Sequence, residues 1–475
     1  MDEYQKTNRV PMEVQRAWAQ RSIENRLSVL RNLRLHLAES AQSLLDAFPR
    51  QMNRTPADSL SSELVPLLDA CRFLEKEAKQ ILAVKHLGRR GRPFWLSGLE
   101  SSVERVPHGT VLVIGPANYP LFLPGVQVLQ ALAAGNAVVW KPGTGGERLA
   151  RIFNQEALES GLPEGVLRVT NDSVEAGMLE LERHPDKVYF TGSSSTGQSV
   201  LKRAAELVIP VVAELSGCDA AILLADADTT LAADALEFSM RLNGSSTCMA
   251  PRRLFMLGKN HDAFLGDLCN RFARMEPNET EPHSRRALDH MLENAREHGA
   301  QVIGDSGTIF IKPILVLNGT PAMSLAKTDL GLPVLIVLQA GGIDELIAMH
   351  FQCPYALTAA IFGGRAESQA LAAKLKAGSI LINDLIVPTA DPRVPFGGRG
   401  ASGYGVTRGA EGLLEMTVAK VIAVRSGTTR RHFAATTKAH EALFHGAIAM
   451  VHGRTWAKKW KGLRQMVVAS RNLKN

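Results

Sequence analysis

The feature that most limits the fold of this chain is a repeat of buried strands and helices that begins near residue 106. Short, uninterrupted apolar runs at 110–114, 137–140 and 187–190 each lead into a turn that contains Gly or Pro, and helix-forming sequence follows. Runs of this kind are typical of parallel strands that helices cover on both faces. These residues therefore predict a parallel α/β sheet, which binds ligands at the carboxyl ends of its strands.

Two further blocks complete the α/β organisation. Residues 12–84 carry apolar residues at three- and four-residue spacing, which predicts two or three antiparallel helices. A second α/β segment runs from 217 to about 408, with predicted strands at 333–338 and 379–382. A chain of 475 residues is too long to fold around one hydrophobic core, since a domain typically has about 150 residues. The sequence therefore predicts an α/β protein with two lobes and a cleft between them.

The composition is ordinary for a soluble globular protein, and a cytoplasmic enzyme is the expectation. The chain is 45% hydrophobic and has no apolar run of about 18 residues, so no transmembrane helix is expected. Its amino terminus does not join a cationic segment to an apolar one, as a secretory signal does. The five cysteines are scattered, with no Cys-x-x-Cys pair, which predicts reduced thiols without a disulfide framework or a metal site.

Positive charge is concentrated at the end of the chain. The net charge is +7, and residues 426–475 hold ten basic residues against one acid, Glu441. Residues 439–451 alternate apolar and small residues, while residues 456–461 interleave Trp with Lys. A basic amphipathic helix with Trp at its border can lie in an anionic membrane interface, so peripheral membrane contact is one interpretation. A solvated tail or a helix packed on a partner subunit are the others, and no nucleic acid partner is expected.

Five short segments occur in a fixed order along the chain. They read Gly-Pro-Ala-Asn-Tyr-Pro at 115–120, Phe-Thr-Gly-Ser at 190–193 with Gly197, Glu-Leu-Ser-Gly at 214–217, Asn-Gly-Ser-Ser-Thr-Cys at 243–248 and Pro-Phe-Gly-Gly at 395–398. No single segment is specific, but their combination resembles the aldehyde dehydrogenase superfamily over about residues 10–425. The resemblance implies a Rossmann-like cofactor lobe, a catalytic lobe and a small oligomerisation arm.

The resemblance implies that Cys248 is the nucleophile of an aldehyde oxidation. A thiol with an ordinary pKa is little ionised at neutral pH, so we expect backbone amides at a helix start and a nearby polarising cofactor to favour the anion of Cys248. Attack on an aldehyde creates an oxyanion, which needs donors held in place. Asn118 matches the family's side-chain amide donor, and the backbone N–H of Cys248 is the second donor.

Glu214 matches the general base of the family and follows the apolar run 208–213. A carboxylate at a strand end over a cleft is partly desolvated, which raises its pKa toward neutrality and suits it to activate water. Relatives that pass the acyl group to coenzyme A generally lack this base. Hydrolysis of the thioester to a free carboxylic acid is therefore favoured, with a CoA-linked or reductive reaction as the alternative.

NADP or NAD is the cofactor that the resemblance implies. The small residues at 190–197 open a helix, whose N-terminus can bind a pyrophosphate. Lys141 matches the lysine that reaches the adenosine ribose. Three residues later, members that prefer NAD commonly carry Glu, whereas Thr144 here removes a charge that would repel the NADP 2′-phosphate. The expected cofactor-binding residues are Ile114, Pro116, Lys141, Thr144, Gly177, Phe190, Gly192, Ser193 and Asp329.

Some residues depart from the family pattern. Ser245 and Ser246 stand where Gly-Gln is usual, and Gly331 replaces an aromatic residue near the nicotinamide. Asp329 aligns with the glutamate that holds the nicotinamide-side ribose, but it is one methylene shorter. These changes are compatible with three consequences. The cofactor is held more loosely, the pocket has room for a bulkier substrate, or the protein is a weakened enzyme that serves as a binding or scaffold subunit. Retention of the nucleophile, the amide donor and the base argues for the enzyme.

Domain boundaries follow from the same resemblance. Residues 1–94 and 108–216 are expected to form the cofactor-binding domain, and residues 217–408 the catalytic domain. Residues 95–107 and 409–425 are expected to form the oligomerisation arm, which predicts a homodimer or homotetramer, and residues 426–475 a basic extension. A small-molecule aldehyde is the expected substrate, and no metal ion is expected.

Overall fold

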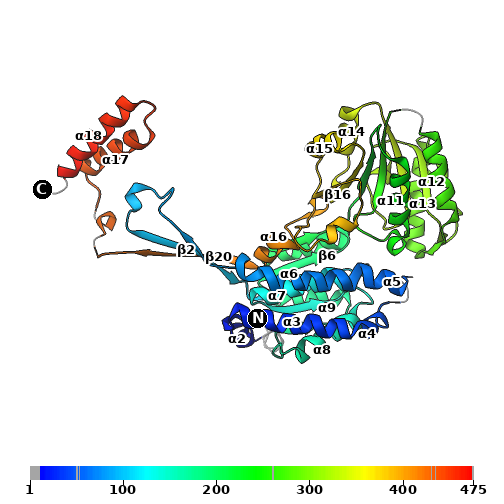
Figure 1. Cartoon of the computed structure of the whole chain (residues 1–475), viewed down its shortest axis with the longest axis horizontal. Coiled ribbons are helices and arrows are strands. Elements are labelled where there is room, and N and C mark those ends of the chain that lie inside the picture. Colours follow the sequence, from blue (N-terminus) through cyan, green and yellow to red (C-terminus); the bar gives the residue numbers. More distant parts are fainter. Residues whose placement is uncertain are drawn as a thin grey trace. The chain divides into compact units, whose positions relative to one another are not determined.

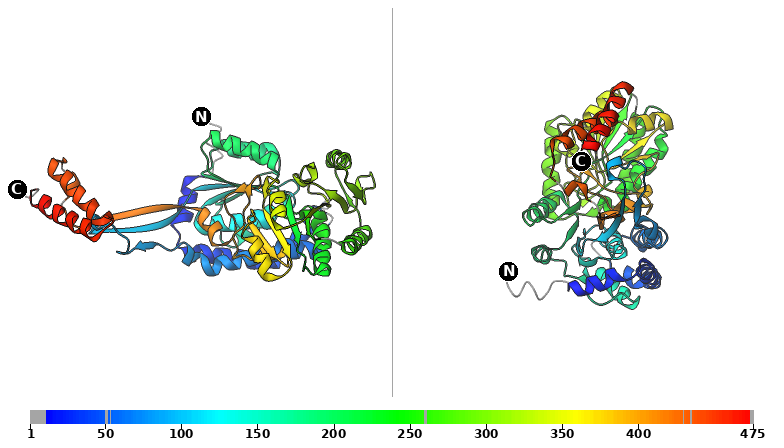
Figure 2. Two further views of the ribbon diagram at one scale, coloured as in Figure 1. Left: turned by 90° about the horizontal axis from the view of Figure 1, so that it is seen from above. Right: turned by 90° about the vertical axis from the view of Figure 1, so that its left-hand side faces the viewer.

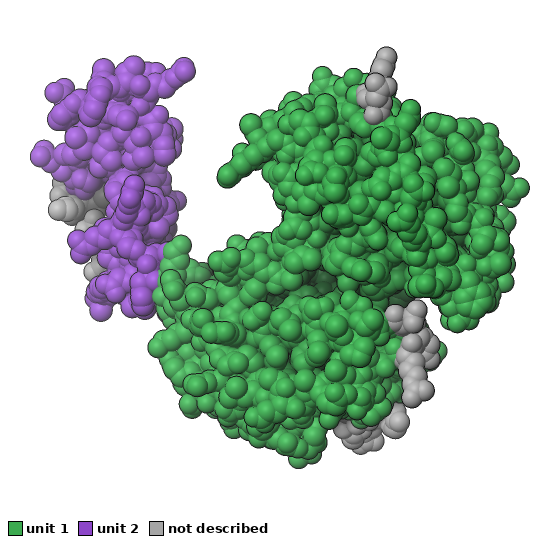
Figure 3. Space-filling model, turned by 45° about the vertical axis from the view of Figure 1, so that its right-hand side comes forward, with its two compact units in different colours: residues 1–85, 103–421 green, residues 86–102, 422–475 purple. Residues whose placement is uncertain are grey.

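The computed structural model describes residues 11–49, 52, 54–258, 261–428, 430–433 and 435–472. Contacts divide the chain into two compact units (Figure 3). Unit 1 comprises Met1–Lys85 and Val103–Val421, and unit 2 comprises His86–Ser102 and Ile422–Asn475. Unit 1 contains two α/β lobes, which confirms the predicted fold class.

The first lobe is built on a six-stranded sheet with the order β19-β7-β6-β3-β4-β5. All neighbouring strands are parallel except β19 and β7. The strands are β3 (Thr110–Ile114), β4 (Ala137–Lys141), β5 (Leu167–Val169), β6 (Lys187–Thr191), β7 (Val211–Glu214) and β19 (Gly403–Tyr404). The helices are α2 (Met12–Gln20), α3 (Ile23–Glu39), α4 (Ala41–Leu45), α5 (Pro56–Ser59), η2 (Leu60–Leu64), α6 (Val65–Ile81), α7 (Phe122–Ala134), α8 (Glu147–Glu159), α9 (Val174–Glu182), α10 (Ser194–Glu206) and α16 (Gly409–Glu415).

Strand β3 shows how the sequence sets the layers of this lobe. Val111 and Val113 pack with residues of α3, α6, α7 and α8, whereas Leu112 and Ile114 pack on the opposite face with α9 and α10. Both faces are covered, so the strand is apolar throughout. Helix α7 is buried on nearly all sides because it lies between the sheet and helices α3 and α6.

One predicted strand begins later than its sequence indicated. Val208 has a φ of 58° and is 88% exposed, so it belongs to the turn after α10. Strand β7 starts at Val211 and ends at Glu214, which places the Glu214 carboxyl at the carboxyl edge of the sheet. The apolar run alone could not separate the turn from the strand.

The second lobe is built on a seven-stranded sheet with the order β11-β13-β14-β9-β8-β16-β17. Only β11 runs antiparallel to its neighbour. The strands of this lobe are β8 (Asp219–Leu223), β9 (Pro251–Leu257), β10 (Asn278–Glu279), β11 (Gln301–Ile303), β12 (Phe310–Ile311), β13 (Ile314–Gly319), β14 (Val334–Ala340), β15 (Tyr355–Ala356), β16 (Thr358–Phe362), β17 (Ser379–Ile382) and β18 (Arg399–Gly400). The helices, several of them labelled in Figure 1, are α11 (Thr229–Arg241), η4 (Leu242–Ser245), α12 (Asp262–Arg274), α13 (Pro282–Glu297), η5 (Ser324–Ala326), α14 (Ile343–His350), α15 (Arg365–Ala372) and η6 (Val387–Ala390).

A three-stranded sheet and a helical hairpin complete the chain. The sheet has the order β1-β2-β20, and Figure 2 shows β2 and β20 as a long ribbon. Its elements are β1 (Lys85–Leu87), η3 (Phe94–Leu96), β2 (Leu99–Pro107) and β20 (Thr417–Arg425). The hairpin follows η7 (Arg431–Phe433) and consists of α17 (Lys438–His452) and α18 (Trp456–Asn472). Within the described residues, no helix is both long enough and apolar enough to cross a bilayer.

Candidate active site

A pocket opens in unit 1 where the carboxyl ends of β3, β6 and β7 meet the loop before β9. Its volume is about 300 Å³. The lining includes all three predicted catalytic residues and four of the predicted cofactor residues. It consists of Pro116, Ala117, Asn118, Leu123, Thr191, Gly192, Ser193, Glu214, Leu215, Ser216, Ser246, Thr247, Cys248, Asp329, Leu330, Gly331, Leu357 and Phe396. Side chains from both lobes therefore meet at one site.

The loop that carries Cys248 has an unusual backbone. Asn243, Gly244 and Ser245 have left-handed φ angles of 53°, 57° and 66°. Ser245 is fully buried, and the Arg252 side chain donates to its Oγ at 2.6 Å and to its carbonyl oxygen at 2.7 Å. Arg252, at the start of β9, therefore fixes the loop at the position where the sequence departs from the family pattern.

The protein groups around Cys248 have opposing effects on the pKa of its thiol. Burial raises the pKa of the Cys248 thiol to about 12, and the negative charges of Glu214, Asp219 and Asp329 act in the same direction. The Arg408 cation opposes them. Without a bound cofactor, burial and the carboxylates outweigh the cation, so the protein groups alone do not favour the thiolate. The thiol rests protonated and has to lose its proton during the reaction.

Asn118 lies in the turn after β3 and is already anchored to the cysteine loop. Its Nδ2 donates to the carbonyl oxygen of Ser246 at 2.9 Å. Its backbone carbonyl oxygen accepts from Arg54 Nη2 at 2.5 Å and from Asn243 Nδ2 at 3.0 Å. A side-chain amide has two N–H bonds, so one remains for a second acceptor. Asn118 is thus held where it borders the pocket.

Behind this turn lies an ion pair that the sequence did not reveal. Arg54 Nη1 donates to Glu63 at 2.7 Å, and both side chains are almost fully buried. Arg54 Nε also donates to Asn243 Oδ1 at 2.7 Å, and its guanidinium lies 4.6 Å from the Tyr119 ring centroid. Glu63 in turn accepts from two backbone amides at the start of α7. The pair ties the N-terminal helices to the Asn118 turn and the cysteine loop.

Glu214 is buried at the end of β7. Its carboxylate accepts from the Thr407 hydroxyl, and its Oε2 accepts from Thr191 Oγ1 at 3.5 Å. Burial raises the pKa of Glu214, while the Arg408 charge and the two hydroxyl groups act to lower it. A carboxyl with a raised pKa can both accept and release a proton, as a general base must. The direction of this shift agrees with the sequence-based expectation.

Arg408 is a second residue that sequence reasoning missed. Its guanidinium is 4.2 Å from the Phe396 ring centroid and 5.5 Å from that of Phe122, and the residue is 3% exposed. Nη1 donates to the carbonyl oxygen of Thr389 at 2.6 Å, whereas Nε and Nη2 are buried without a hydrogen-bond partner among the described residues. Burial lowers its pKa, and the charge of Glu214 acts in the opposite direction. The residue thus supplies positive charge close to the acids of the site.

Asp329 borders the pocket and is engaged from within the protein. Arg252 Nε and the backbone N–H of Gly331 both donate to its Oδ1 at 2.8 Å. The ion pair is buried, with 4% and 8% of the two side chains exposed. Gly331 has a φ of 66°, and a Cβ atom there would meet Ser246 Oγ at 3.7 Å, an ordinary contact distance. Asp329 therefore supports the cysteine loop through Arg252, in addition to the ribose contact predicted for it.

The residues present fit a dinucleotide. The pocket reaches the N-terminus of α10, where Ser193 Oγ accepts from Thr196 N at 3.3 Å and the buried Ser194 Oγ has no partner among the described residues. A Cβ atom on Gly192 would lie 2.8 Å from Phe190 Cζ, so the segment predicted to bind phosphate packs on that ring. Unpaired donors at a helix N-terminus suit a pyrophosphate.

The other predicted cofactor residues are not part of the lining of this pocket. Lys141 is buried at the end of β4, and its methylenes would be 3.6–3.7 Å from a Cβ atom on Gly177. Burial lowers the pKa of Lys141, with the charges of Asp172 and Glu175 opposing this. Thr144 is exposed in the following turn. Ile114 and Phe190 are core residues of β3 and β6.

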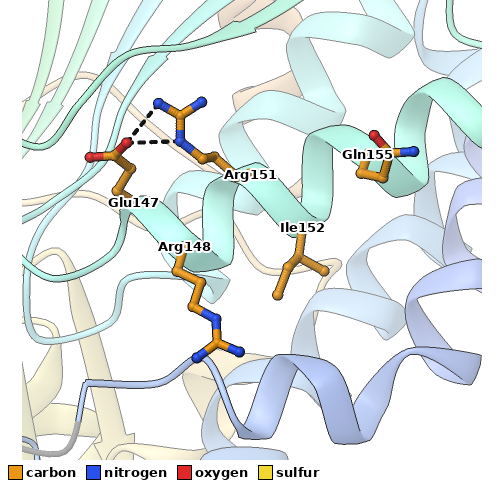
Figure 4. A pocket seen from close by; sticks show the side chains of 5 residues that line it. All are labelled: Glu147, Arg148, Arg151, Ile152 and Gln155. Atoms are coloured by element: carbon orange, nitrogen blue, oxygen red, sulfur yellow. Dashed lines mark hydrogen bonds and ion pairs between the residues drawn. The ribbon is translucent and has the colours of Figure 1, made fainter.

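A separate hollow of about 480 Å³ lies on the surface of α8 (Figure 4). It is lined by Glu147, Arg148, Arg151, Ile152 and Gln155. The Glu147 carboxylate pairs with Arg151 at 2.6 Å, and the lining contains no nucleophile. The pocket around Cys248 is therefore the candidate active site.

Comparison with known proteins agrees with this geometry. The aldehyde dehydrogenase family profile matches residues 2–422. The chain belongs to the aldehyde dehydrogenase family. Enzymes of this family oxidise aldehydes with NAD(P), and this member is accordingly an NAD(P)-dependent oxidoreductase.

Relatives and solved structures extend over most of the chain. A 4,4′-diapolycopene aldehyde oxidase from Methylomonas is 28% identical over 84% of this chain and 77% of the relative. A probable coniferyl aldehyde dehydrogenase from Pseudomonas aeruginosa is 30% identical over 83% of this chain and 85% of the relative. An NADP complex of a glyceraldehyde-3-phosphate dehydrogenase from Bacillus halodurans superimposes with a TM-score of 0.81 at 27% identity, covering 88% of this chain and 90% of the other. A betaine aldehyde dehydrogenase from Staphylococcus aureus bound to NAD⁺ shares the fold, with a TM-score of 0.81 at 23% identity over 90% of each chain.

Proposed function

We propose that this dehydrogenase converts an aldehyde to a free carboxylic acid through a thioester on Cys248, which water hydrolyses. The observation that supports this reaction is the shared pocket of Cys248, Asn118 and Glu214 beside the N-terminus of α10. These residues supply a nucleophile, an oxyanion donor and a base, the three groups that the two half-reactions require.

In the first half-reaction, the Cys248 sulfur adds to the aldehyde carbon as the thiol proton leaves. Because the pKa of this thiol is raised to about 12, the proton passes to a base when substrate binds. The proposed acceptor is Glu214, a buried carboxylate in the same pocket, whereas Asp329 is paired with Arg252. The free N–H of Asn118 and the backbone N–H of Cys248 then stabilise the oxyanion.

When bound, NAD(P) supplies the hydride acceptor that converts the adduct to a thioester. Glu214 then releases the thiol proton to solvent. In the second half-reaction, Glu214 takes a proton from water, the water oxygen bonds to the thioester carbon, and the Cys248 sulfur leaves and receives that proton. One aldehyde, one water and one NAD(P)⁺ give one acid, one NAD(P)H and one proton. Buried Thr407 and Thr191 orient the Glu214 carboxylate for this step.

We propose that both NAD and NADP serve as cofactors. Thr144 places no negative charge near the adenosine ribose, which permits the NADP 2′-phosphate. Asp172 and Glu175 lie near enough to Lys141 to affect its pKa, and they reduce the positive charge that would favour NADP. Lys141, Gly192 and Ser193 would bind the adenosine and phosphate groups, and Asp329 the nicotinamide-side ribose.

The proposed substrate is an apolar aldehyde. The pocket is lined by Leu123, Leu330, Leu357 and Phe396, and Gly331 adds no side chain to this lining. The relative from Methylomonas is named for a polyene aldehyde. A long apolar substrate fits this lining better than a charged one, since burial of apolar surface is favourable.

The proposed assembly is a homodimer or homotetramer in the cytoplasm, with peripheral membrane contact through residues 426–475. Val418, Val421 and Val424 of β20 are 45%, 64% and 58% exposed. Exposed apolar residues on a strand of the predicted arm favour a partner subunit.

The reaction is tested by following NAD(P)H absorbance with a panel of aliphatic and aromatic aldehydes. Wild type should form NAD(P)H, and Cys248→Ala should not, whereas Cys269→Ala should behave as wild type. The product is then analysed with and without coenzyme A. Formation of free acid at the same rate with and without coenzyme A would support hydrolysis. Formation of a CoA thioester with faster turnover would support the CoA-linked alternative.

A further inference from the structure

The hairpin of α17 and α18 is packed through its smallest residues. A Cβ atom on Gly446 would lie 2.7 Å from Met466 N, and one on Gly462 would lie 2.4 Å from Met450 N. Gly446, Gly462 and Ala469 are the buried residues among those described from 435 to 472. The two backbones therefore touch, and large side chains form no core between the helices.

Large apolar side chains lie on the outside of the hairpin. They are Phe444, Ile448 and Val451 of α17 and Trp456, Trp460 and Val467 of α18, each between 42% and 79% exposed. The spacings of three, four and seven residues place each set on one face of its helix. Gly446 and Gly462 lie on other faces of their helices, where α17 and α18 contact each other. A helix pair with small residues inside and large residues outside needs an apolar environment to cover it.

Positive charge surrounds these apolar faces. From 438 to 472 the sequence holds seven basic residues and a single acid, Glu441. Lys459 Nζ lies 5.8 Å from the ring centroid of the exposed Trp456. Cations next to exposed Trp rings are typical of segments in the headgroup layer of a membrane.

The charges discriminate between possible partners. A second copy of the hairpin would bring two basic surfaces together, with Glu441 as the single acid on each side to offset them. A nucleic acid would neutralise the cations but would leave Phe444, Ile448 and Val467 exposed to water. An anionic bilayer satisfies both requirements, because its headgroups attract the cations and its acyl chains accept the apolar side chains.

We propose that the α17–α18 hairpin docks in the surface layer of an anionic lipid bilayer, with Trp456 and Trp460 at the headgroups. The inference rests on the peripheral contact of the proposed function and assigns it to specific faces and to one lipid charge. Helix α18 has 17 residues and carries several cations, so it lies along the surface and does not cross it. Such docking would place the enzyme where apolar aldehydes dissolve.

Sedimentation of the full chain with lipid vesicles tests the proposal. Wild type should pellet with vesicles that contain phosphatidylglycerol and remain in solution with phosphatidylcholine alone, and salt should weaken the binding. The double variant Trp456→Ala/Trp460→Ala should bind about tenfold more weakly. The affinity of Lys458→Gln/Lys461→Gln for these vesicles should fall roughly 25-fold, since each cation near an anionic surface raises the affinity about fivefold. Phe310→Ala and Lys202→Gln, at exposed positions of unit 1, are the matched controls.

The outcomes separate this proposal from the others. Failure of wild type to bind anionic vesicles at low salt, or equal binding by all variants, would overturn it. A lower molar mass of the Trp variant in light scattering, with vesicle binding unchanged, would show instead that a second copy covers this face. All variants should oxidise a water-soluble aldehyde like wild type. Intact vesicle binding without any aldehyde oxidation would uphold the docking and reject the proposed reaction.

Discussion

Gly217 lies directly against the backbone of Cys248. A Cβ atom on Gly217 would stand 2.4 Å from the Cys248 carbonyl oxygen, closer than atoms can approach. The Glu-Leu-Ser-Gly segment that carries the proposed base therefore also sets the position of the proposed nucleophile. The lack of space for a Cβ atom explains why the third residue after Glu214 is a glycine, which the sequence pattern alone does not explain.

Gly217→Ala should displace the cysteine loop and lower kcat by about 10²-fold, because a shift of about 1 Å at a reacting group has an effect of this size. The matched control is Gly266→Ala, where nothing lies within 4 Å of the added atom. Steady-state NAD(P)H formation measures both variants. If Gly217→Ala has the same kcat as wild type, the loop adapts to the added methyl group.

Arg408→Met should shift the acid limb of the pH–kcat profile to higher pH. The Arg408 cation lowers the pKa of Glu214 against the larger effect of burial, so its removal raises that pKa. Since Glu214 acts as a base only when ionised, activity is lost as pH falls through its pKa, and this loss then begins at higher pH. At neutral pH we expect kcat to fall by up to about 10²-fold, the lower range of general-base contributions.

Arg408→Lys is the matched control for this prediction, because it keeps the charge while it changes the geometry. Its acid limb should lie closer to that of wild type. Parallel profiles for wild type and Arg408→Met, even with a lower plateau, would show that Arg408 acts through packing between Phe122 and Phe396 and not through its charge.

Asp329→Asn should destabilise the protein even without cofactor. The change leaves the buried Arg252 guanidinium without its ionic partner, and breaking a buried pair typically costs about 3–5 kcal/mol. The free energy of unfolding of the cofactor-free protein, from denaturant titration, measures this loss. Unchanged stability together with a higher KM for NAD(P) would mean that Asp329 serves the ribose alone.

Thr144→Glu should separate the two cofactors. A carboxylate at this exposed turn would repel the 2′-phosphate, so kcat/KM for NADP should fall about tenfold or more while that for NAD changes little. NAD thus serves as the internal control. Equal losses with both cofactors would place the 2′-phosphate away from residue 144.

Much of the fold could be predicted from local sequence. The strand predictions at 110–114, 137–140 and 187–190 correspond to β3, β4 and β6, because doubly buried strands leave an uninterrupted apolar run. The ordered segments likewise indicated residues that the fold brings to one pocket, including Asn118, Glu214 and Cys248. The residue assignments within that pocket stay predictions until variants are measured.

Long-range polar contacts could not be predicted in the same way. Arg54 is 64 residues from Asn118 and 189 from Asn243 along the chain, and nothing in its local sequence marks it as their partner. Arg408 likewise looks like an ordinary surface cation until the fold encloses it between two aromatic rings. The direction of the Cys248 pKa shift depends on the sum of such burial and charge effects, which a motif does not contain.

The protonated state of Cys248 bears on the durability of the enzyme. Peroxides and electrophilic metabolites react with thiolates far faster than with thiols. We therefore expect slower oxidation and alkylation of Cys248 in the cofactor-free protein than in enzyme that is engaged with substrate.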